Sequence, residues 1–538
     1  MGRANVPQSG TDLPPAGDLC FRAFGSVIVF ITVLLLLFAL IVFWRIPSQS
    51  VVNLMPDDAF YYFGISRNFV KGHGFSFDTI NPTNGFQPLW MYLLLPVAYL
   101  TRDMSVEVFP RAAFFYQALL LVLAVGLLHF ALRRWCSASV LLFSDAIILL
   151  LGMRLFFNGM ETPVVFLSFA LTVWCLSRGG AESHDVTYFA MVGMLSALIL
   201  LARLDSVFIV LIWIAVHFMQ RERAWSYLGI TVAVLAVLVA PYLLYNLWAF
   251  GDWMPISGRL KNSFPHIEQI DWRRVPVQHY VPLLVCPLAT GWLWRRKHQQ
   301  VPLLLFLMAW SAGSWLHAVH TILFMKWGVF KWHFSPYWIP LTVIVPVALH
   351  ELQLHGLARA SCAAGVILWA ASVLSIAQFI HETLLTSGPP AWATVAYRAA
   401  VWARENTSGD AVFAMKDAGR FGYYSERRVI NLDGLVNNME LQQYLRARRL
   451  SEYFRKKGVG FLAQHAISPR STMVDNAPAV AEGSYSQTHI SYLSRLYNIQ
   501  SDAIPLFRKY ERFRERHRDG VFLIWEIKSP QVASVSAR

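Results

Sequence analysis

The expected architecture of this chain is inferred outward from residues 55–90, MPDDAFYYFGISRNFVKGHGFSFDTINPTNGFQPLW. It opens with two adjacent acids, Asp57 and Asp58, shortly after the first long apolar run. Its second half is rich in Gly, Pro and Asn, as loops are, and it ends in an aromatic helix-like stretch. The segment therefore predicts a loop outside the membrane whose acids either cap a helix or carry chemistry.

The composition is that of an integral membrane protein. Of 538 residues, 56% are hydrophobic and only 14% are charged, whereas soluble domains carry about 25% charged residues. The net charge of +14 does not call for a nucleic-acid partner, because Lys and Arg collect in the cytoplasmic loops of membrane proteins. The five cysteines lie in or beside apolar runs without metal-ligand spacing, so we interpret them as small buried side chains.

About eleven apolar runs approach the ~20 residues that span a bilayer as a helix. They lie at about 24–44, 109–132, 138–153, 161–177, 186–202, 204–219, 226–249, 279–294, 301–320, 334–353 and 359–380. We expect the first run to stay in place as an anchor, because no cleavage-type motif follows it. A further apolar stretch, 86–100, is too short to span and is expected to be re-entrant or interfacial.

Loop charge orients these spans. Alternate short loops hold nine basic residues on one side and four on the other. The richer set consists of Arg133, Arg134, Arg178, Arg221, Arg223, Arg295, Arg296, Lys297 and Arg359. Because the richer side is cytoplasmic, we expect a cytoplasmic N-terminus, with the 55–90 segment and the C-terminal region on the outer face.

The composition changes near residue 385. We expect a membrane domain at 1–384, with its first outer loop and flanking helices at 45–108, and an extracytoplasmic α/β domain at 385–538. The α/β pattern consists of strand-like runs at 411–415, 429–432, 459–463 and 521–527 and a helical run at 439–457. Two basic clusters, within 446–457 and 508–518, are either solvated faces or contacts for membrane lipids or an acidic acceptor.

Asp57 and Asp58 precede an aromatic-rich amphipathic run at 59–65. A carboxylate at a helix N-terminus caps the helix and complements its dipole. Adjacent residues lie about 100° apart around a helix axis, so at most one acid of the pair can cap. The other acid then faces elsewhere, which makes the pair a candidate for acid–base chemistry.

Four later loops bring polar residues to the same membrane face: Glu161, Arg203, Asp205, Lys261, Lys331 and His333. Acids and cations at one interfacial level suit a reaction on a phosphorylated lipid. An acid can take the proton of an attacking hydroxyl, and a cation can stabilise a departing phosphate. Each of these residues also has a purely structural interpretation. Arg203 and Asp205 form an interfacial ion pair in that case, Glu161 caps a helix, and the lysines are solvated side chains.

The order of residues through the first outer loop resembles that of bacterial GT-C glycosyltransferases, in the arabinofuranosyltransferase-like and protein-mannosyltransferase-like branches. The resemblance is carried by Asp57-Asp58-Ala59-Phe60-Tyr61-Tyr62, Arg67-Asn68, Gly72-His73-Gly74, Asn81-Pro82-Thr83-Asn84-Gly85-Phe86 and Pro88-Leu89-Trp90. It extends to 159–161 and 203–205 and, weakly, to 417–419 and 431–435. The architecture that it implies covers nearly the whole chain, although only the first loop has specific motifs.

The resemblance implies a sugar transferase that faces the periplasm from the bacterial inner membrane and uses a polyprenyl-phosphate sugar as donor. An acceptor hydroxyl attacks the anomeric carbon with inversion, Asp57 is the expected base and Asp58 supports it. Lys261 is the first candidate to hold the departing phosphate, followed by Arg203 and Lys331. The division of labour between the two aspartates stays open.

The remaining expected contacts lie around the sugar. Glu161 matches the second acidic loop of the family and is expected to orient the acceptor or hold a divalent cation. Other expected substrate contacts are His73, Asn84, Gln87, Asp205 and His333. No ligand cluster decides whether a metal is needed.

Two departures from the family pattern leave the sugar open between arabinofuranose, mannose and others. Asp-Asp stands where protein mannosyltransferases have Asp-Glu, and Gln87 stands where many relatives have His. The acceptor is equally open between a cell-wall glycan, a lipid-linked glycan and a protein such as a pilin.

A transporter or lipid-carrier flippase is the alternative function. It predicts ionisable residues near the bilayer midplane on broken helices, often in repeated halves. The middles of the expected spans are nearly free of charge, with Asp145 as the main exception, and no halves repeat. We therefore expect transferase chemistry.

Overall fold

The structure is a computed structural model of the chain. It describes residues 44–133, 135–151, 155, 157–178, 186–219, 224–295, 301–353, 358–384, 391–467, 505–515 and 518–527, with five further positions between 33 and 41. Most of the expected first span at 24–44 lies outside the described residues, as do Arg134, Arg221, Arg223, Arg296 and Lys297.

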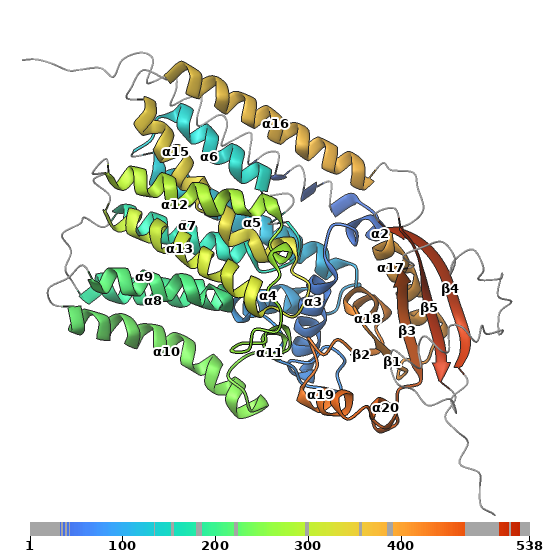
Figure 1. Cartoon of the computed structure of the whole chain (residues 1–538). Coiled ribbons are helices and arrows are strands. Elements are labelled where there is room, and N and C mark those ends of the chain that lie inside the picture. The colour runs from blue at the N-terminus through green and yellow to red at the C-terminus, as the bar shows by residue number, and fades with distance from the viewer. Residues whose placement is uncertain are drawn as a thin grey trace, which may run out of the picture.

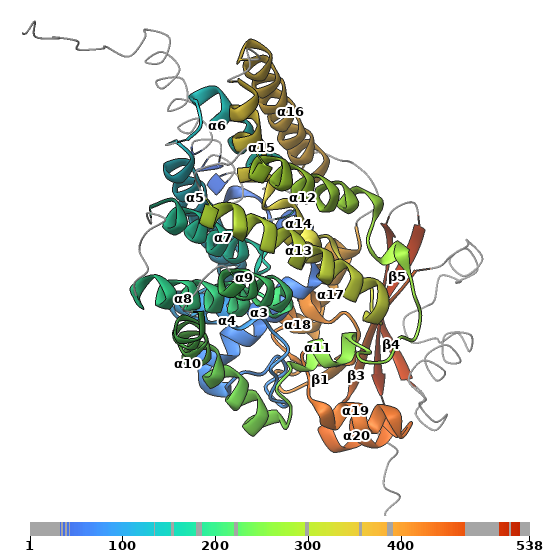
Figure 2. The ribbon, with the colours of Figure 1, turned by 60° about the vertical axis from the view of Figure 1, so that its left-hand side comes forward.

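Long helices that lie side by side form the larger part of the molecule (Figure 1, Figure 2). They are α5 (Val108–Leu132), α6 (Ala138–Leu151), α7 (Thr162–Arg178), α8 (Val186–Ala202), α9 (Val207–Met219), α10 (Ala224–Phe250), α12 (Tyr280–Arg295), α13 (Val301–Phe324), α15 (Leu341–Leu352) and α16 (Ala358–Leu384). Helices suit these apolar runs, because a helix satisfies its own backbone hydrogen bonds in a medium without water.

Three described helices are long and apolar enough to cross a membrane: Val108–Leu132, Tyr227–Phe250 and Val301–Phe324. Six shorter apolar helices accompany them, among them Thr162–Arg178 and Val186–Ala202. The expectation of about eleven spans stays a prediction. The 86–100 stretch forms α4 (Pro88–Leu100), whose 13 residues reach about 20 Å and so fall short of a ~30 Å hydrocarbon core.

The first outer loop comprises α2 (Ser48–Val51), α3 (Asp57–Asn68), the π-helical turn η1 (Phe69–His73) and an irregular segment that leads to α4. Pro56 fixes the entry to α3, and both aspartates lie in its first turn. The irregular segment is held by the buried Asp78, whose carboxylate accepts hydrogen bonds from the backbone N–H groups of Ile80 and Asn81 at 2.8 and 2.7 Å. These hydrogen bonds hold the backbone of the irregular segment around Asp78.

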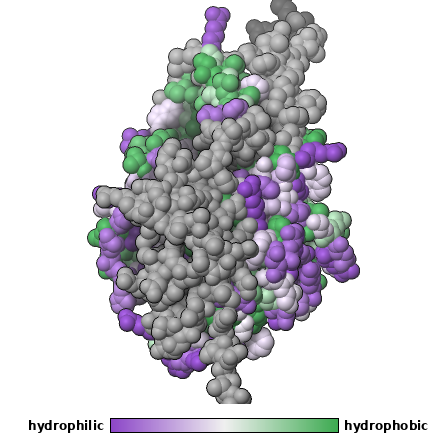
Figure 3. All heavy atoms as spheres, turned by 90° about the vertical axis from the view of Figure 1, so that its right-hand side faces the viewer, coloured by the Kyte–Doolittle hydropathy of each residue, from purple (hydrophilic) through white to green (hydrophobic). Residues whose placement is uncertain are grey.

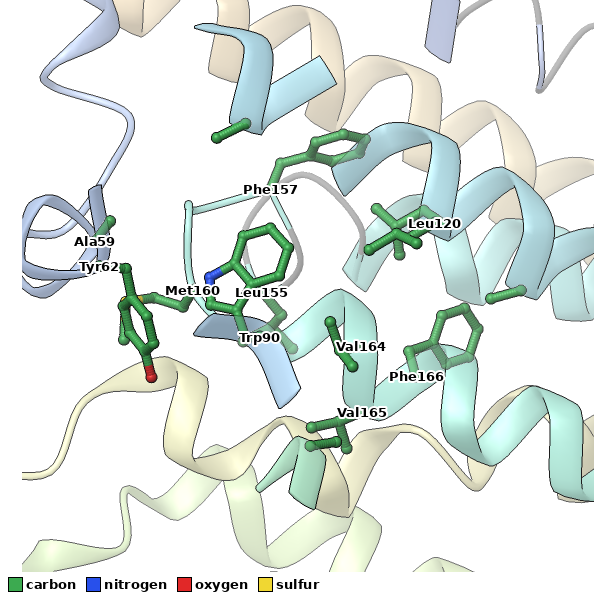
Figure 4. Close-up of a cluster of buried hydrophobic side chains, with 14 of the residues drawn as sticks. Ala59, Tyr62, Trp90, Leu120, Leu155, Phe157, Met160, Val164, Val165 and Phe166 are labelled. Carbon is green, nitrogen blue, oxygen red and sulfur yellow. The ribbon is translucent and has the colours of Figure 1, made fainter. Parts of the chain in front are cut away.

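The segment before α7 packs tightly against α3. Gly159 has a φ of +77°, and a Cβ there would lie 2.7 Å from the Cβ of Ala59, so only glycine fits. The indole of the buried Trp90 donates a hydrogen bond to the Gly159 carbonyl over 3.1 Å. Ala59 and Trp90 belong to one cluster of buried side chains from α3, α4, α5, α7 and the segment before α7 (Figure 4).

Short elements connect the helices at the end that faces the C-terminal region. They are η3 (Leu204–Ser206), α11 (Ile256–Lys261), η4 (Trp272–Arg274), η5 (Val277–His279), η6 (Lys331–Phe334) and α14 (Ser335–Trp338). Three of them carry residues expected in the site: η3 carries Asp205, α11 carries Lys261, and η6 carries Lys331 and His333.

The C-terminal region is α/β. Its elements are α17 (Trp392–Asn406), β1 (Val412–Met415), α18 (Gly419–Ser425), β2 (Arg428–Asn431), α19 (Met439–Arg446), α20 (Leu450–Lys457), β3 (Phe461–Ile467), β4 (Pro505–Glu515) and β5 (Arg518–Ile527). The sheet order is β2-β1-β3-β5-β4. Strand β1 pairs in parallel with β2 and β3, and β5 pairs antiparallel with β3 and β4.

The four strand-like runs of the sequence coincide with β1, β2, β3 and β5. The helical run expected at 439–457 is instead two helices, because the chain turns at Arg448, which has a φ of +55°. Lys456 and Lys457 in the first basic cluster both pair with Glu440, at 2.6 and 2.9 Å. Among described side chains, part of that cluster is thus neutralised on the surface, while the side chains at 508–518 lie outside the description.

Helix α3 lies between the helical bundle and the C-terminal sheet, with α18 packed against it (Figure 1). The face that carries the sheet is largely hydrophilic over its coloured lower part, with hydrophobic side chains gathered near the top (Figure 3). The first outer loop is therefore enclosed between an apolar bundle and a soluble-type region.

Candidate functional site

A cavity of about 410 Å³ opens where the first outer loop, the ends of the bundle helices and the C-terminal region meet. Small-molecule sites commonly have volumes of about 300–1,000 Å³. Seven of the residues expected in the site line it: Asp58, Gln87, Glu161, Arg203, Asp205, Lys261 and His333. These side chains come from five separate segments, so the cavity exists only in the folded chain.

The two aspartates of α3 face different surroundings. Asp58 lines the cavity. Asp57 instead meets the start of α18: its carboxylate accepts hydrogen bonds from the backbone N–H groups of Gly419 at 2.7 Å and Arg420 at 2.9 Å. Both carboxylate oxygens of Asp57 are thus occupied, and the acid that faces the cavity is Asp58. This placement moves the proposed base from Asp57 to Asp58.

Asp57 is held electrostatically as well as by hydrogen bonds. Its carboxylate lies 3.2 Å from the Arg420 guanidinium, which is itself buried. Burial raises the pKa of Asp57 to about 7, and the charge and backbone N–H of Arg420 act against that rise. A Cβ on Gly419 would come within 2.1 Å of the Asp57 carbonyl oxygen, so glycine permits this close approach.

A buried network occupies Arg203. Its Nε and Nη2 donate to the two carboxylate oxygens of Asp205 at 2.8 and 2.7 Å, and its Nη1 donates to the Trp332 carbonyl at 2.6 Å. Glu161 lies 3.5 Å from the same Nη1. Arg203 is 1% exposed. With these partners, the guanidinium of Arg203 joins neighbouring segments of the protein through charge-assisted hydrogen bonds.

Glu161 and Gln87 extend this network toward the first loop. The Tyr62 hydroxyl donates to Glu161 Oε2 over 3.3 Å and accepts the backbone N–H of Gln87 over 3.0 Å. The Gln87 side-chain oxygen in turn accepts the backbone N–H of Leu204 over 3.0 Å. Three loops are therefore joined by hydrogen bonds around one wall of the cavity.

Two further residues of the network were not expected from the sequence. His317 Nε2 lies 3.1 Å from Asp205 Oδ2, and its Nδ1 lies 2.7 Å from the Tyr337 hydroxyl. His317 is a polar residue inside the apolar run at 301–320, and an ionisable residue in a membrane helix is itself a signal of function. That signal could have identified it.

Lys261 differs from Arg203. It lies at the end of α11 and lines the cavity. No carboxylate among the described residues lies within ion-pair distance of its ammonium, and no described group holds it by a hydrogen bond. Lys261 therefore brings a positive charge to the cavity that no described carboxylate compensates.

The structure places four expected residues outside the cavity lining: Asp57, described above, and His73, Lys331 and Asn84. His73 and Lys331 are exposed. Asn84 is buried, and its side-chain oxygen accepts the backbone N–H of Ile256, the first residue of α11, over 3.0 Å. Asn84 thus fixes the helix that carries Lys261, a role that its place in the sequence did not indicate.

The C-terminal region contributes directly to the site. Leu435 and Val436 line the cavity. Tyr61 is also a lining residue, and its hydroxyl accepts hydrogen bonds from the Ala418 backbone N–H at 3.0 Å and the Asn431 side chain at 2.8 Å. These residues belong to the 417–419 and 431–435 segments, to which the sequence resemblance extended only weakly.

Acidic groups gather near Asp58 without forming an evident metal site. Asp433 accepts the Asp417 backbone N–H at 2.6 Å, and burial together with the nearby Asp417 raises the pKa of Asp433. Among the described residues, no group of three or more His, Cys, Asp or Glu side chains is placed to hold a metal ion. The expectation on a divalent cation stays open.

Comparison with known proteins places this geometry in context. Residues 387–517 match the family described as "Domain of unknown function (DUF8728)". A search of curated proteins finds no significant sequence match.

Two crystal structures of ArnT from Cupriavidus metallidurans are similar in structure to this chain. The one bound to undecaprenyl phosphate has a TM-score of 0.52 and 13% identity, with 94% of this chain and 99% of the other covered. The apo structure has a TM-score of 0.54 and 14% identity, with 93% and 98% covered.

The archaeal oligosaccharyltransferase AglB from Archaeoglobus fulgidus, in complex with an inhibitory peptide and a dolichol-phosphate, is also similar. Its TM-score is 0.49 at 14% identity, with 82% of this chain and 69% of the other covered, so the fold assignment rests on the two ArnT structures. The long apolar helices and this fold mark a multi-pass membrane protein. The chain has the GT-C glycosyltransferase fold.

Proposed function

We propose that this protein is a membrane glycosyltransferase that moves a sugar from a polyprenyl-phosphate donor to an acceptor hydroxyl. One observation carries the proposal: a single cavity is lined by a carboxylate, Asp58, and by Lys261, whose ammonium has no counter-ion among the described residues, in a chain with the GT-C fold. The lipid phosphate bound to one of the ArnT structures supports the class of donor.

The reaction needs a base and a phosphate site. The acceptor oxygen attacks the anomeric carbon of the sugar, and the bond from that carbon to the phosphate oxygen breaks. The bonding electrons leave with the phosphate, and the acceptor proton passes to Asp58. Attack opposite to the leaving group inverts the anomeric centre.

Lys261 is the proposed partner of the departing phosphate. Phosphate leaves without a dedicated acid when a cation stabilises its negative charge. Arg203 also lines the cavity, but it is bound to Asp205 and to the Trp332 carbonyl. We therefore propose that Lys261 binds the departing phosphate and that Arg203 positions the Asp205 and Trp332 segments of the cavity wall. Lys331 is exposed outside the lining and is no longer a candidate of the same rank.

Glu161 and Gln87 are proposed to orient the substrate. Both line the cavity, and both are fixed by Tyr62 or Leu204. Side chains held in this way lose little further conformational entropy when a ligand binds. His333 is another polar residue of the lining.

We keep arabinofuranose and mannose as the first sugars to test, and a glycan or a protein such as a pilin as the acceptor. The outer-face location, the cytoplasmic N-terminus and the division into a membrane domain at 1–384 and an extracytoplasmic domain at 385–538 belong to the same proposal. They rest on loop charge and composition.

The test is a transfer assay with purified protein and a panel of polyprenyl-phosphate sugars. Asp58→Asn and Asp57→Asn are compared in parallel. We expect Asp58→Asn to lower kcat by about 10²–10⁴-fold, the usual contribution of a general base. Asp57→Asn should act mainly on protein stability.

Two outcomes count against the proposal. Wild-type protein that transfers no sugar from any donor contradicts the transferase activity itself. An Asp58→Asn variant with wild-type kcat, beside a folded Asp57→Asn variant that is inactive, contradicts only the assignment of the base.

A further inference from the structure

The hydroxyl of Tyr61 has a hydrogen that the described part of the protein does not use. A tyrosine hydroxyl donates one hydrogen bond and accepts up to two. Tyr61 accepts from the Ala418 backbone N–H at 3.0 Å and from the Asn431 side-chain nitrogen at 2.8 Å. Its acceptor positions are filled, so its hydrogen points away from both donors. No described protein acceptor lies within hydrogen-bond distance of it.

The direction of the Asn431 hydrogen bond follows from its other contact. The same amide nitrogen lies 3.1 Å from Asp433 Oδ2, and that oxygen also accepts the Asp417 backbone N–H at 2.6 Å. Reversing the amide would set its carbonyl oxygen against a carboxylate oxygen, which is repulsive. The amide nitrogen therefore faces Tyr61 and donates to it.

The hydroxyl of the neighbouring Tyr62 both accepts and donates a hydrogen bond within the protein. Tyr62 accepts the Gln87 backbone N–H at 3.0 Å and donates to Glu161 Oε2 at 3.3 Å. Tyr61 and Tyr62 are both buried and both line the cavity. The difference is that Tyr62 has an acceptor for its hydrogen, whereas the Tyr61 hydroxyl has none among the residues that the structure describes.

We propose that the Tyr61 hydroxyl donates a hydrogen bond to an oxygen atom of the bound substrate, next to Asp58. The proposal rests on the transferase function proposed above and adds a binding residue to that site. Asp58 and Tyr61 are three residues apart on α3 and therefore lie on one helix face. Tyr61 donates a hydrogen bond from the same face on which Asp58 takes the acceptor proton.

The inference also gives the C-terminal region a function in the site. Ala418 and Asn431 are more than 350 residues from Tyr61 in the sequence, and they fix the orientation of its hydroxyl. A substrate oxygen in the cavity then meets a donor whose direction is already set, which lowers the entropic cost of binding. The C-terminal region is thus part of the substrate-binding site.

The substrate oxygen belongs either to the phosphate of the donor or to a hydroxyl of the sugar or acceptor, and two measurements separate these sources. The first is the affinity of the full-length protein for undecaprenyl phosphate without a sugar. The second is kcat/KM for transfer with the donor that the wild-type protein uses. Both are made on wild type, Tyr61→Phe and Asn431→Asp.

Tyr61→Phe removes only the hydroxyl, and Asn431→Asp leaves the hydroxyl but offers it a protein acceptor. We expect both variants to lose about 10- to 100-fold in one of the two measurements, the cost of a lost hydrogen bond to a charged or strongly polar oxygen. Tyr423→Phe is the matched control. The Tyr423 hydroxyl is buried and donates a 2.9 Å hydrogen bond to the Val106 carbonyl, and Tyr423 is not a lining residue of the cavity. It should lower thermal stability without changing affinity or kcat/KM.

Weaker binding of undecaprenyl phosphate by Tyr61→Phe would assign the contact to the phosphate. Unchanged binding with a lower kcat/KM would assign it to the sugar or the acceptor. Unchanged values in both measurements overturn the role of Tyr61, while transfer by the wild type still supports the proposed function. If the wild type transfers nothing, the proposed function fails, and the binding measurement alone decides on Tyr61, with unchanged affinity overturning it.

Discussion

Asp57 and Arg420 lie 363 residues apart in the sequence and meet through two hydrogen bonds to one oxygen. The Arg420 backbone N–H donates to Asp57 Oδ1 over 2.9 Å, and the Arg420 Nη1 donates to the same oxygen over 3.2 Å. The Arg420 side chain also donates to the carbonyls of Val52 and Met55. One arginine of the C-terminal region thus binds both the start of α3 and the chain that precedes it.

Replacing Arg420 by alanine should destabilise the protein strongly. Removing one partner of a buried ion pair leaves the other charge without compensation, which costs about 3–5 kcal/mol. We expect a lower thermal unfolding midpoint and faster proteolysis of the C-terminal region. Arg428→Ala is the control, because Arg428 is exposed on β2 and should change stability by no more than about 0.5 kcal/mol. Equal midpoints for the two variants would contradict the role of Arg420.

The stability of the protein should depend on pH through Asp57. The pKa of this carboxyl rises from the usual 3.8 to about 7 in the folded protein, so between these values the folded state binds more protons than the unfolded state. The contribution of Asp57 to stability therefore falls as the pH rises from about 4 to about 7 and is constant above. Asp57→Asn lacks this titration.

The measurement is the unfolding midpoint of wild type and Asp57→Asn between pH 5 and pH 8. We expect the wild type to lose more stability than the variant over this range. Parallel profiles for the two proteins would show that Asp57 does not titrate there.

Replacing Lys261 by alanine should weaken donor binding. Its ammonium lines the cavity without a counter-ion among the described residues, and the loss of one charge-assisted contact to a phosphate costs about 10- to 100-fold in affinity. We expect a higher KM for the polyprenyl-phosphate sugar, with partial recovery in Lys261→Arg. Lys331→Ala serves as the control, since Lys331 is exposed and outside the lining. The reverse pattern would move the phosphate site to Lys331.

Arg203→Lys should impair folding before it impairs binding. A lysine has one ammonium and cannot reproduce the two parallel hydrogen bonds to Asp205 together with the bond to the Trp332 carbonyl. We expect a lower yield of folded protein and a midpoint lowered by the equivalent of about 3 kcal/mol. A stable Arg203→Lys protein whose only change is a raised donor KM would instead make Arg203 a phosphate ligand.

Gly85→Ala should separate the first outer loop from the C-terminal region. A Cβ at Gly85 would lie 1.8 Å from the carbonyl oxygen of Leu435, and backbone atoms have little room to move aside. We expect a loss of about 1–3 kcal/mol from overpacking and lower activity, because Leu435 lines the cavity. Gly126→Ala is the control, since a Cβ there meets nothing within 4 Å. Similar stability of the two variants would argue against a tight contact at Gly85.

Much of the fold could be expected from local patterns. The apolar runs predicted the long helices, because a helix satisfies all the backbone groups of such a run within the run itself. Short strand-like runs predicted β1, β2, β3 and β5. Strand β4 was missed because its sequence, PLFRKYERFRE, is rich in charge, and the break between α19 and α20 was missed because it depends on the backbone turn at Arg448.

The site was partly accessible to the same reasoning. Topology grouped Asp58, Glu161, Arg203, Asp205, Lys261 and His333 on one membrane face, and the structure brings these six side chains to one cavity. His73 and Lys331 met the same criterion but are exposed. The predicted topology assigns a residue to one face of the membrane, but it does not determine the direction in which the side chain points.

The sequence by itself determined the class of the protein: a membrane chain with a polar first outer loop and a C-terminal α/β region, because composition and periodicity act locally. Only the tertiary structure decided the surroundings of the two aspartates that open α3. Adjacent residues turn about 100° apart on a helix, and the carboxylate that meets α18 is determined by contacts with Gly419 and Arg420 far along the chain. Asp57 binds there, so Asp58 faces the cavity.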